Sequence, residues 1–146
     1  MNAHRSALQS YGQAARTVSP GPQVVMLYDG ILKCLGEARL AIEENRIVDR
    51  FNALKRASDI VNGLSSSLDF ENGGEIAPML ERFYNYVFFR LQRASMESSI
   101  AIVDEIAANV SEMRAAWAQV AEQPAPSAAP EPQPAAGGAG SVTVSA

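Results

Sequence analysis

The chain has 146 residues, of which 47% are hydrophobic, 19% charged and 7% aromatic, and this profile is typical of one globular domain. Its 12 basic and 16 acidic residues give a net charge of -4, and no cluster of Lys and Arg interleaved with aromatic residues occurs, so a nucleic-acid partner is not expected. The single cysteine excludes an internal disulfide and a cysteine-rich zinc site. No stretch approaches the roughly 20 uninterrupted apolar residues of a membrane span, and the N-terminus has no apolar signal core, so we expect no membrane insertion and a cytoplasmic location.

Composition divides the chain into three segments. Residues 122–146 contain five of the eight prolines and three of the ten glycines, with almost no large apolar side chains. Such a segment cannot offset the entropy lost on ordering, so we expect a disordered tail. We expect residues 19–121 to fold as one domain, and residues 1–18, whose apolar positions are widely spaced, to form a short N-terminal arm or helix.

The first predicted helix begins at Ser19 and Pro20 and runs to about Asn45. A serine side chain can cap free backbone N–H groups, and proline is tolerated in the first helical turn. The apolar residues that follow recur at intervals of three or four, which places them on one face of the helix. They are Val24, Leu27, Tyr28, Ile31, Leu35, Ala38 and Ile42.

Three further helices follow from the same periodicity. We predict the second from about Asp49 to the Gly73-Gly74 break, with apolar positions at Phe51, Leu54, Val61, Leu64 and Leu68. The third spans about residues 75–94, with Pro78 in its opening turn, and residues 95–99 form a turn into the fourth. The fourth carries Val103, Ile106, Val110, Met113, Trp117 and Val120. Helices of this length joined by short links predict an all-α, antiparallel up-and-down four-helix bundle.

The residue patterns of catalysis and of cofactor binding are missing from the sequence. It contains no nucleophile elbow, phosphate-binding loop, dinucleotide fingerprint or His-Glu-x-x-His pattern. The only histidine, His4, lies in the N-terminal arm, so a triad or a histidine-rich metal site would lack an anchored imidazole. Cys34, with Lys33 as its only adjacent charge, is interpreted as a packed core residue. We therefore expect no enzyme, no cofactor and no metal.

The third predicted helix has more apolar surface than a bundle core requires. Its large apolar residues cover an arc of about 260°, against about 160° for the fourth helix. Met26 and Leu40 also lie off the main stripe of the first helix. Either the N-terminal arm or an amphipathic rim of tyrosines accounts for the surplus, or the surplus forms a hydrophobic groove for a partner's amphipathic helix. The residues in the arc are Met79, Leu80, Phe83, Tyr84, Tyr86, Val87, Phe88, Phe89 and Leu91.

Residues 19–30, SPGPQVVMLYDG, resemble the signature of the FliS family of flagellar secretion chaperones, and Met26 to Gly30 are its specific part. Two further pieces agree in order and spacing: residues 84–94, YNYVFFRLQRA, and residues 113–119, MRAAWAQ. Leu8 and Tyr11 are similar to the apolar-x-x-Tyr arm of the family. The resemblance extends over about residues 5–121.

The resemblance implies a cytoplasmic export chaperone that binds the C-terminal segment of flagellin in hydrophobic grooves. Such a chaperone prevents premature polymerisation of flagellin and helps deliver it to the flagellar export gate, and other flagellar regulators are further implied partners. A disordered client with amphipathic helices would lay its apolar side chains into the grooves and become ordered only while bound. The residues assigned to the groove or the arm are Leu8, Tyr11, Met26, Tyr84, Tyr86, Phe88 and Phe89.

Structural roles are assigned to the other motif residues, which are Ser19, Pro20, Leu27, Tyr28, Asp29, Gly30 and Trp117. Leu27 and Tyr28 belong to the predicted inner stripe of the first helix. Gly30 is expected to let a neighbouring backbone approach closely. Asp29 could cap a helix, pair with an arginine or be solvated, and we favour solvation.

A second class of protein fits the same features. A helical structural or regulatory module would use the apolar surplus as a homodimer interface, and sedimentation without any client would detect the dimer. The sequence also leaves open whether the N-terminal arm competes with the client for the groove or clamps the bound client.

Deleting residues 124–146 is expected to leave the melting temperature and client binding unchanged, because this segment has no apolar side chains to anchor it. Thermal denaturation of the full-length and shortened chains, together with a binding titration, measures both quantities. A loss of several degrees, or a large loss of binding, would show that the tail packs on the domain.

Overall fold

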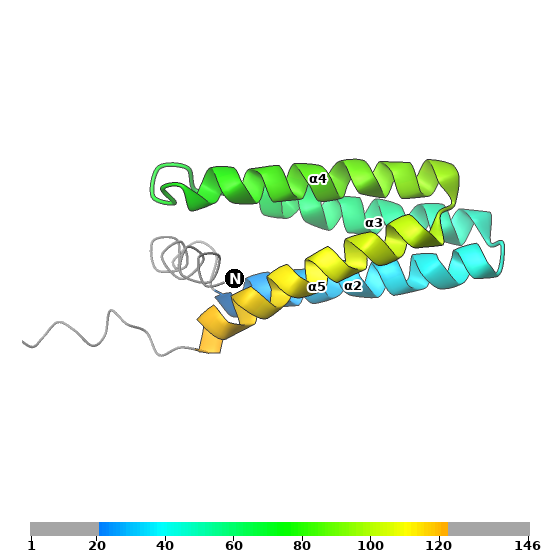
Figure 1. Ribbon diagram of the computed structural model, residues 1–146, viewed down its shortest axis with the longest axis horizontal. Helices are drawn as coiled ribbons and strands as arrows, with labels where there is room; N and C mark the ends of the chain where they lie inside the picture. The colour runs from blue at the N-terminus through cyan, green and yellow to red at the C-terminus, as the bar shows by residue number, and fades with distance from the viewer. Residues whose placement is uncertain (1–20, 123–146) are drawn as a thin grey trace, which may run out of the picture.

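The computed structural model describes residues 21–122, which form four α-helices and no strand. The helices are α2 (Gly21–Glu43), α3 (Ile47–Ser66), α4 (Ile76–Glu97) and α5 (Ile100–Glu122). Successive helices run in opposite directions, so the predicted antiparallel up-and-down bundle is confirmed (Figure 1). The N-terminal arm, Ser19 and Pro20, and the predicted tail from residue 123 on lie outside the described residues.

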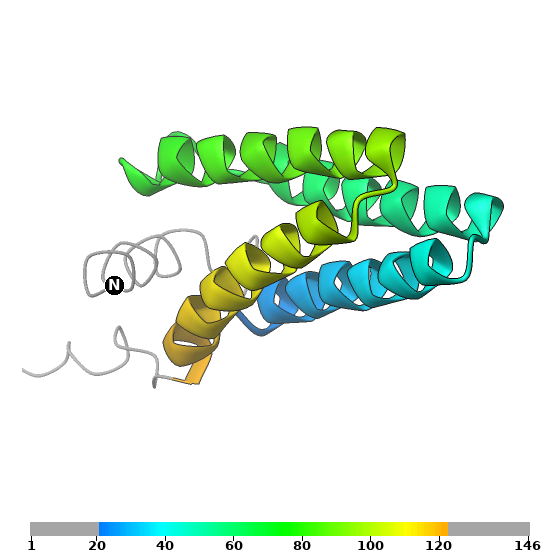
Figure 2. The ribbon, with the colours of Figure 1, turned by 45° about the vertical axis from the view of Figure 1, so that its right-hand side comes forward.

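Each helix packs against two others. α2 packs on α3 and on α5, and α4 also packs on these two helices, so α2 and α4 lie diagonally across the bundle. α5 runs obliquely: it starts beside the end of α4 and diverges from α4 toward its own C-terminal end (Figures 1 and 2). The two helices are therefore closest at the α4–α5 turn and farther apart at the other end of the bundle.

The core consists of the apolar residues that recur every three or four positions on the inner face of each helix. Its largest fully buried side chains include Tyr28, Ile31, Leu35, Leu80, Leu91, Ile106 and Trp117. Burying a side chain of this size contributes roughly 1.5–3 kcal/mol, so packing of these faces stabilises the bundle more than helix propensity does. Cys34 is buried in the same cluster, as predicted.

Two residues that periodicity assigned to inner faces are exposed instead. Leu27 is 42% exposed and Phe51 is 54% exposed. Adjacent helical positions point about 100° apart, so with Tyr28 fully buried Leu27 turns to the edge of the inner face. Phe51 stands near the start of α3, where its side chain extends past the core toward the neighbouring helix α4.

The turn between α2 and α3 is closed by Asn45, whose φ of 58° is left-handed. The Arg46 N–H donates to the Ala41 carbonyl at 2.8 Å, and the Asn45 N–H donates to Ile42 at 3.2 Å. This is a Schellman-type cap, in which asparagine tolerates the conformation that glycine usually supplies.

α3 ends at Ser66, earlier than the predicted break at Gly73-Gly74. The Ser66 and Ser67 hydroxyls donate to the Asn62 and Leu64 carbonyls at 2.8 and 3.0 Å, so the serines compete with the helix for its own backbone acceptors. In the loop that follows, the Asp69 carboxylate accepts hydrogen bonds from the Glu71 and Asn72 N–H groups, and these bonds, with the Asn72 side chain, lower the pKa of Asp69.

α4 continues to Glu97, three residues beyond the predicted end at about Ala94. The turn into α5 is only Ser98 and Ser99, and Ser98 adopts a left-handed conformation with φ 50°. Ser99 caps α5, because its hydroxyl accepts the Ile102 N–H at 3.1 Å.

The close backbone approach predicted at Gly30 occurs at Gly21 instead. A Cβ atom at Gly21 would lie 3.1 Å from the Cβ and 3.3 Å from the Cα of Ala121, so the start of α2 touches the end of α5. A Cβ at Gly30 would meet only the end of the Ile60 side chain, at 3.2 Å. Gly30 thus makes room for a side chain of α3 and not for its backbone.

Leu35→Ala is expected to destabilise the chain by about 2–5 kcal/mol, because Leu35 is 1% exposed and its truncation leaves a cavity. Leu40→Ala on the same helix is the matched control; its side chain is 47% exposed, so the expected cost is below about 1 kcal/mol. Urea denaturation of both variants measures the difference, and equal costs would contradict this account of the core.

Candidate functional site

The three sequence motifs meet in the centre of the bundle. Tyr28 from residues 19–30, Tyr84 from residues 84–94 and Trp117 from residues 113–119 are all buried in the core. The Tyr28 and Tyr84 hydroxyls lie 2.9 Å apart, and their rings meet edge to face with centroids 6.4 Å apart. Burial raises the pKa of Tyr28 far above its usual value, and the Tyr84 hydroxyl and the Trp117 indole offset part of this rise.

This arrangement corrects the assignment of Tyr84 to an open groove. Its side chain is 3% exposed and belongs to the core, where its hydroxyl is paired with that of Tyr28. The structural roles predicted for Tyr28 and Trp117 agree with their burial.

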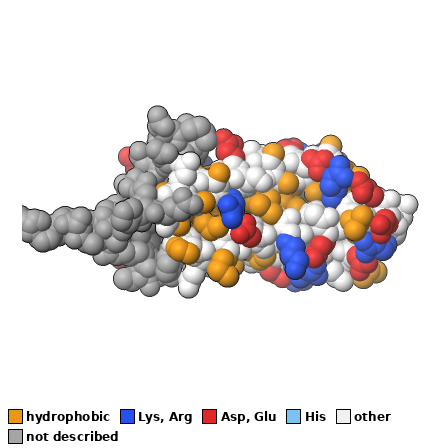
Figure 3. All heavy atoms as spheres, turned by 90° about the horizontal axis from the view of Figure 1, so that it is seen from below, with side chains coloured by type: hydrophobic (Ala, Val, Ile, Leu, Met, Phe, Trp, Pro, Cys, Tyr) orange, Lys and Arg blue, Asp and Glu red, His pale blue; other side chains and the backbone are white. Residues whose placement is uncertain are grey.

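Several large apolar side chains remain exposed on the described residues. On the face formed by α2 and α5, apolar side chains gather toward the N-terminal end of α2, and acidic and basic side chains alternate toward its other end (Figure 3). Met26, predicted to lie off the core, is 70% exposed near that N-terminal end. The other exposed large apolar residues are Leu27, Leu40, Ile47, Val48, Phe51, Phe70, Phe89 and Met96.

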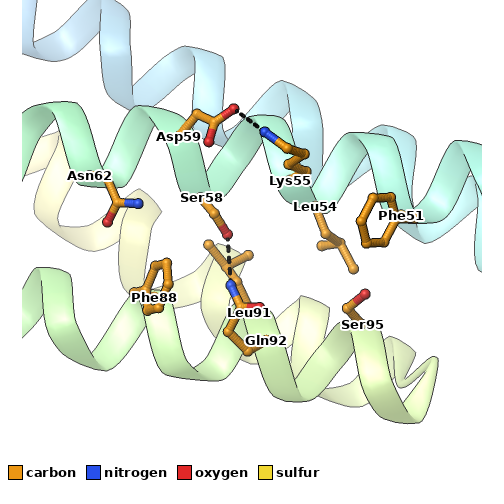
Figure 4. Close-up of a pocket in the computed structure, with 10 residues that line it drawn as sticks. All are labelled: Phe51, Leu54, Lys55, Ser58, Asp59, Asn62, Phe88, Leu91, Gln92 and Ser95. Carbon is orange, nitrogen blue, oxygen red and sulfur yellow. Dashed lines mark hydrogen bonds and ion pairs between the residues drawn. The ribbon is translucent and has the colours of Figure 1, made fainter.

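A groove of about 220 Å³ runs between α3 and α4, and we call it the α3–α4 groove. Leu54 and Leu91 lie between the two helices, Phe51 and Ser95 lie at one end, and Phe88 lies near the other (Figure 4). The groove is lined by Phe51, Leu54, Lys55, Ser58, Asp59, Asn62, Phe88, Leu91, Gln92 and Ser95.

A polar bridge crosses the middle of the groove. The Gln92 side-chain amide donates to the Ser58 hydroxyl at 3.3 Å, while Lys55 and Asp59 form an ion pair on the α3 side at 3.1 Å (Figure 4). Gln92, Lys55 and Asp59 are exposed, so their polar groups can exchange partners at little cost. The groove is therefore apolar at its floor and ends, with adaptable polar groups between them.

Tyr86 belongs to a different part of the surface, the seam between α4 and α5. Its hydroxyl donates to the Glu105 carboxylate, and the Arg90 guanidinium donates to both oxygens of the same carboxylate at 2.6 and 3.1 Å. Asn109 donates to the Tyr86 hydroxyl at 2.9 Å. Arg90, and to a smaller extent Tyr86, lowers the pKa of Glu105, whereas burial and the Glu105 carboxylate raise the pKa of Tyr86.

Asp29 forms an ion pair and is not simply solvated, contrary to the expectation that we favoured. Arg114 of α5 donates to both Asp29 carboxylate oxygens, at 2.7 and 3.2 Å, and lowers the pKa of Asp29. The pair joins α2 to α5 across a separation of 85 residues. Both side chains are at least 38% exposed, so the pair orients the two helices more than it stabilises them.

The predicted site residues are thus not gathered in one place. Phe88 lines the α3–α4 groove, Phe89 is 66% exposed on the outside of α4, Tyr86 faces α5, and Met26 lies on α2. Leu8 and Tyr11 lie outside the described residues. The motifs contain no residue of α3, so they did not indicate its part in the groove; the signal that could have revealed it was Phe51, a large aromatic residue next to the charged Arg50 in the first turns of that helix.

Within residues 21–122, no three potential metal ligands come together, and no helix is long and apolar enough to cross a bilayer. The features that remain are an apolar groove and exposed apolar side chains on a helical bundle. These features define a helical protein-binding module.

Comparison with known proteins specifies the module further. The model of the family described as flagellar protein FliS matches residues 3–124. The chain is 35% identical over 121 residues to the flagellar secretion chaperone FliS of Salmonella typhimurium, which covers 79% of this chain and 90% of that protein. It is 33% identical over 99 residues to the flagellar secretion chaperone FliSB of Pseudomonas aeruginosa, covering 68% and 79% of the two chains. It is 32% identical over 115 residues to FliS of Escherichia coli, covering 75% and 85%.

The chain therefore belongs to the FliS family of flagellar secretion chaperones, as its motifs indicated. The matched proteins are named chaperones and not enzymes, and the family membership gives the chain a chaperone role in flagellar export.

Glu105→Gln is expected to lower the melting temperature at pH 7 by a few degrees, because it removes the charged acceptor shared by Arg90 and Tyr86. The pKa of Glu105 is lowered in the folded chain, so this stabilisation is present above the ordinary glutamate pKa and is lost as pH falls through the lowered value. In thermal melts from neutral pH to about pH 3, the difference in melting temperature between Glu105→Gln and the wild type should shrink as the pH falls. Glu112→Gln, at an exposed position on the same helix, is the control. If the difference in melting temperature for Glu105→Gln stays constant with pH, the stabilising role given to the Glu105 carboxylate is wrong.

Proposed function

We propose that this chain binds the C-terminal segment of flagellin, keeps it from polymerising early and aids its delivery to the flagellar export apparatus from the cytoplasm. The observation that carries the proposal is the α3–α4 groove, because it supplies an open apolar surface on a chain of the chaperone family. The export gate and other flagellar regulators are the further partners that this role implies.

The size of the groove supports a helical ligand. The α3 wall extends from Phe51 to Asn62, eleven residue steps apart, or about 16 Å at the helical rise of 1.5 Å per residue. That length equals three helical turns, which suits a partner helix with apolar anchors at i, i+3 or i+4, and i+7. The aromatic side chains at the two ends of the groove would flank such a helix.

The same binding mode explains both protection and release. A bound segment has its apolar stripe covered, so the stripe is not available for contacts with other flagellin copies. A segment that is disordered when free becomes ordered only on the groove, and the entropy lost on ordering lowers the net affinity. Moderate affinity favours later release to the export apparatus.

For the N-terminal arm we consider the two alternative roles that the sequence left open. Leu8 and Tyr11 either cover the apolar surface of the free chain or clamp the bound client. Substituting both by alanine separates the roles: affinity holds or rises if the arm competes, and falls at least tenfold if the arm clamps.

Phe51→Ala is expected to weaken binding of the flagellin C-terminal segment about tenfold, or about 1.4 kcal/mol, because an aromatic anchor at the end of the groove is lost. Phe70→Ala is the matched control, since Phe70 is 51% exposed but lies in the loop between α3 and α4, outside the lining of the groove. Isothermal titration calorimetry measures both affinities and should give a negative heat-capacity change with weak salt dependence.

The same titration has outcomes that count against the proposal. A wild-type chain that does not bind the flagellin segment at all would rule it out, and a steep salt dependence would point to recognition led by charge. If the chain instead self-associates in sedimentation, and Phe51→Ala disperses the dimer, the homodimer alternative is correct.

A further inference from the structure

The end of the bundle where α3 begins and α4 ends carries an unusual arginine. Arg50 is partly buried, and one of its terminal N–H groups donates to the Ser98 hydroxyl at 2.5 Å. Its Nε atom is buried and has no hydrogen-bond acceptor within residues 21–122. The buried Nε–H is out of reach of a ligand, but the terminal N–H groups that Ser98 does not use can donate to an acceptor that the free chain does not provide.

Most other arginines of residues 21–122 are paired with a carboxylate. Six of them form an ion pair with a carboxylate, and these are Arg39, Arg46, Arg56, Arg90, Arg93 and Arg114. Arg50 and Arg82 form no such pair among the described residues, but Arg82 is exposed to water. Arg50 is therefore the one partly buried arginine of residues 21–122 whose charge no carboxylate balances.

Exposed apolar residues lie close to Arg50 in the sequence of α3, and one of them, Phe51, also lines the α3–α4 groove. Ile47, Val48 and Phe51 are each more than half exposed and occupy about one turn of α3 around Arg50. Met96 is 78% exposed and lies beside Ser95, which lines the same end of the groove as Phe51 (Figure 4). A segment lying in the groove and leaving it at this end would pass over apolar side chains and then reach one unbalanced cation.

We propose that Arg50, which stands next to Phe51 at the end of the α3–α4 groove, is a specificity-determining residue: its guanidinium donates to a side-chain carboxylate of the bound flagellin segment, beside the apolar anchor seated at Phe51. This inference rests on the proposed function. A guanidinium offers five donors in a planar fork that matches a carboxylate, and such pairs are shorter and stronger than neutral hydrogen bonds. Because Arg50 is partly buried and has no carboxylate of its own, the charge pair would discriminate against segments that carry a neutral or basic residue at this position.

The bond to Ser98 does not explain the charge of Arg50. A serine hydroxyl needs only one of the five donors, and the turn at Ser98 is already held by the Ser98 and Ser99 N–H groups, which donate to the Ala94 carbonyl. A residue that served only to fix this turn would not require a guanidinium.

The test is the dissociation constant of the flagellin C-terminal segment for three variants, measured by calorimetry with melting temperatures as the check of folding. Arg50→Gln is expected to weaken binding at least tenfold. Ser98→Ala keeps the charge and removes the hydrogen bond, so its affinity should stay within twofold of the wild type. Arg93→Gln is the matched charge control, because Arg93 lies near the same end of α4 but is paired with Glu97.

A second arm of the test changes the ligand. A flagellin segment whose Asp and Glu residues are replaced by Asn and Gln should bind the wild type more weakly, by the factor lost in Arg50→Gln, and should bind Arg50→Gln no more weakly than the unmodified segment does. The effect of Arg50→Gln should also shrink as salt concentration rises.

Each contrary outcome has a distinct meaning. If the wild type binds but Arg50→Gln binds within twofold, or if Ser98→Ala loses as much affinity as Arg50→Gln, Arg50 only holds the turn and the inference is wrong. If the wild type does not bind the segment, the proposed function fails and this inference fails with it.

Discussion

The rest of the bundle depends on one buried contact, the pair of hydroxyls of Tyr28 and Tyr84. They lie 2.9 Å apart in a mostly apolar core, and they join α2 to α4, the two helices that lie diagonally across the bundle. A buried hydroxyl without a partner costs free energy, so the pair selects one rotation and one register of these helices. Trp117 of α5 packs into the same cluster and is 1% exposed. Once these three side chains are in place, the seams with α3 follow from apolar packing.

The residues of this central contact differ from the residues that we propose meet a partner. Each of the three motifs contributes at least two side chains to the buried core, so the motifs help to specify how the bundle is assembled. The side chains that we propose meet a partner, such as Phe51 and Phe88, line the α3–α4 groove. A core closed around a hydrogen-bonded pair can remain unchanged while the outer surface binds and releases a ligand, because the two sets of side chains are nearly independent.

The main effect of the exposed ion pairs on the bundle is to align neighbouring helices. Asp29 with Arg114 links α2 to α5, and Glu105 with Arg90 and Tyr86 links α4 to α5 where these two helices are still close. Pairs with this much exposure contribute little free energy, but they favour one alignment of helices over its neighbours. Arg50 differs from the paired arginines because it is partly buried and has no carboxylate partner among the described residues. Its charge is therefore available to a partner that binds at the end of the α3–α4 groove.

The sequence by itself determined the four helices and their antiparallel order, because apolar periodicity and short turns are local properties of the chain. It also determined the family, because the motifs are stretches of consecutive residues. It could not decide which part of the broad apolar arc of α4 faces inward: Tyr84 is buried whereas Phe89 is exposed, although both are aromatic residues on one helix. That choice depends on where α2 and α5 lie, and periodicity within a single helix carries no such information. For the same reason the Asp29–Arg114 pair, whose partners are 85 residues apart, and the groove that α3 and α4 build together were settled only when tertiary packing brought distant segments into contact.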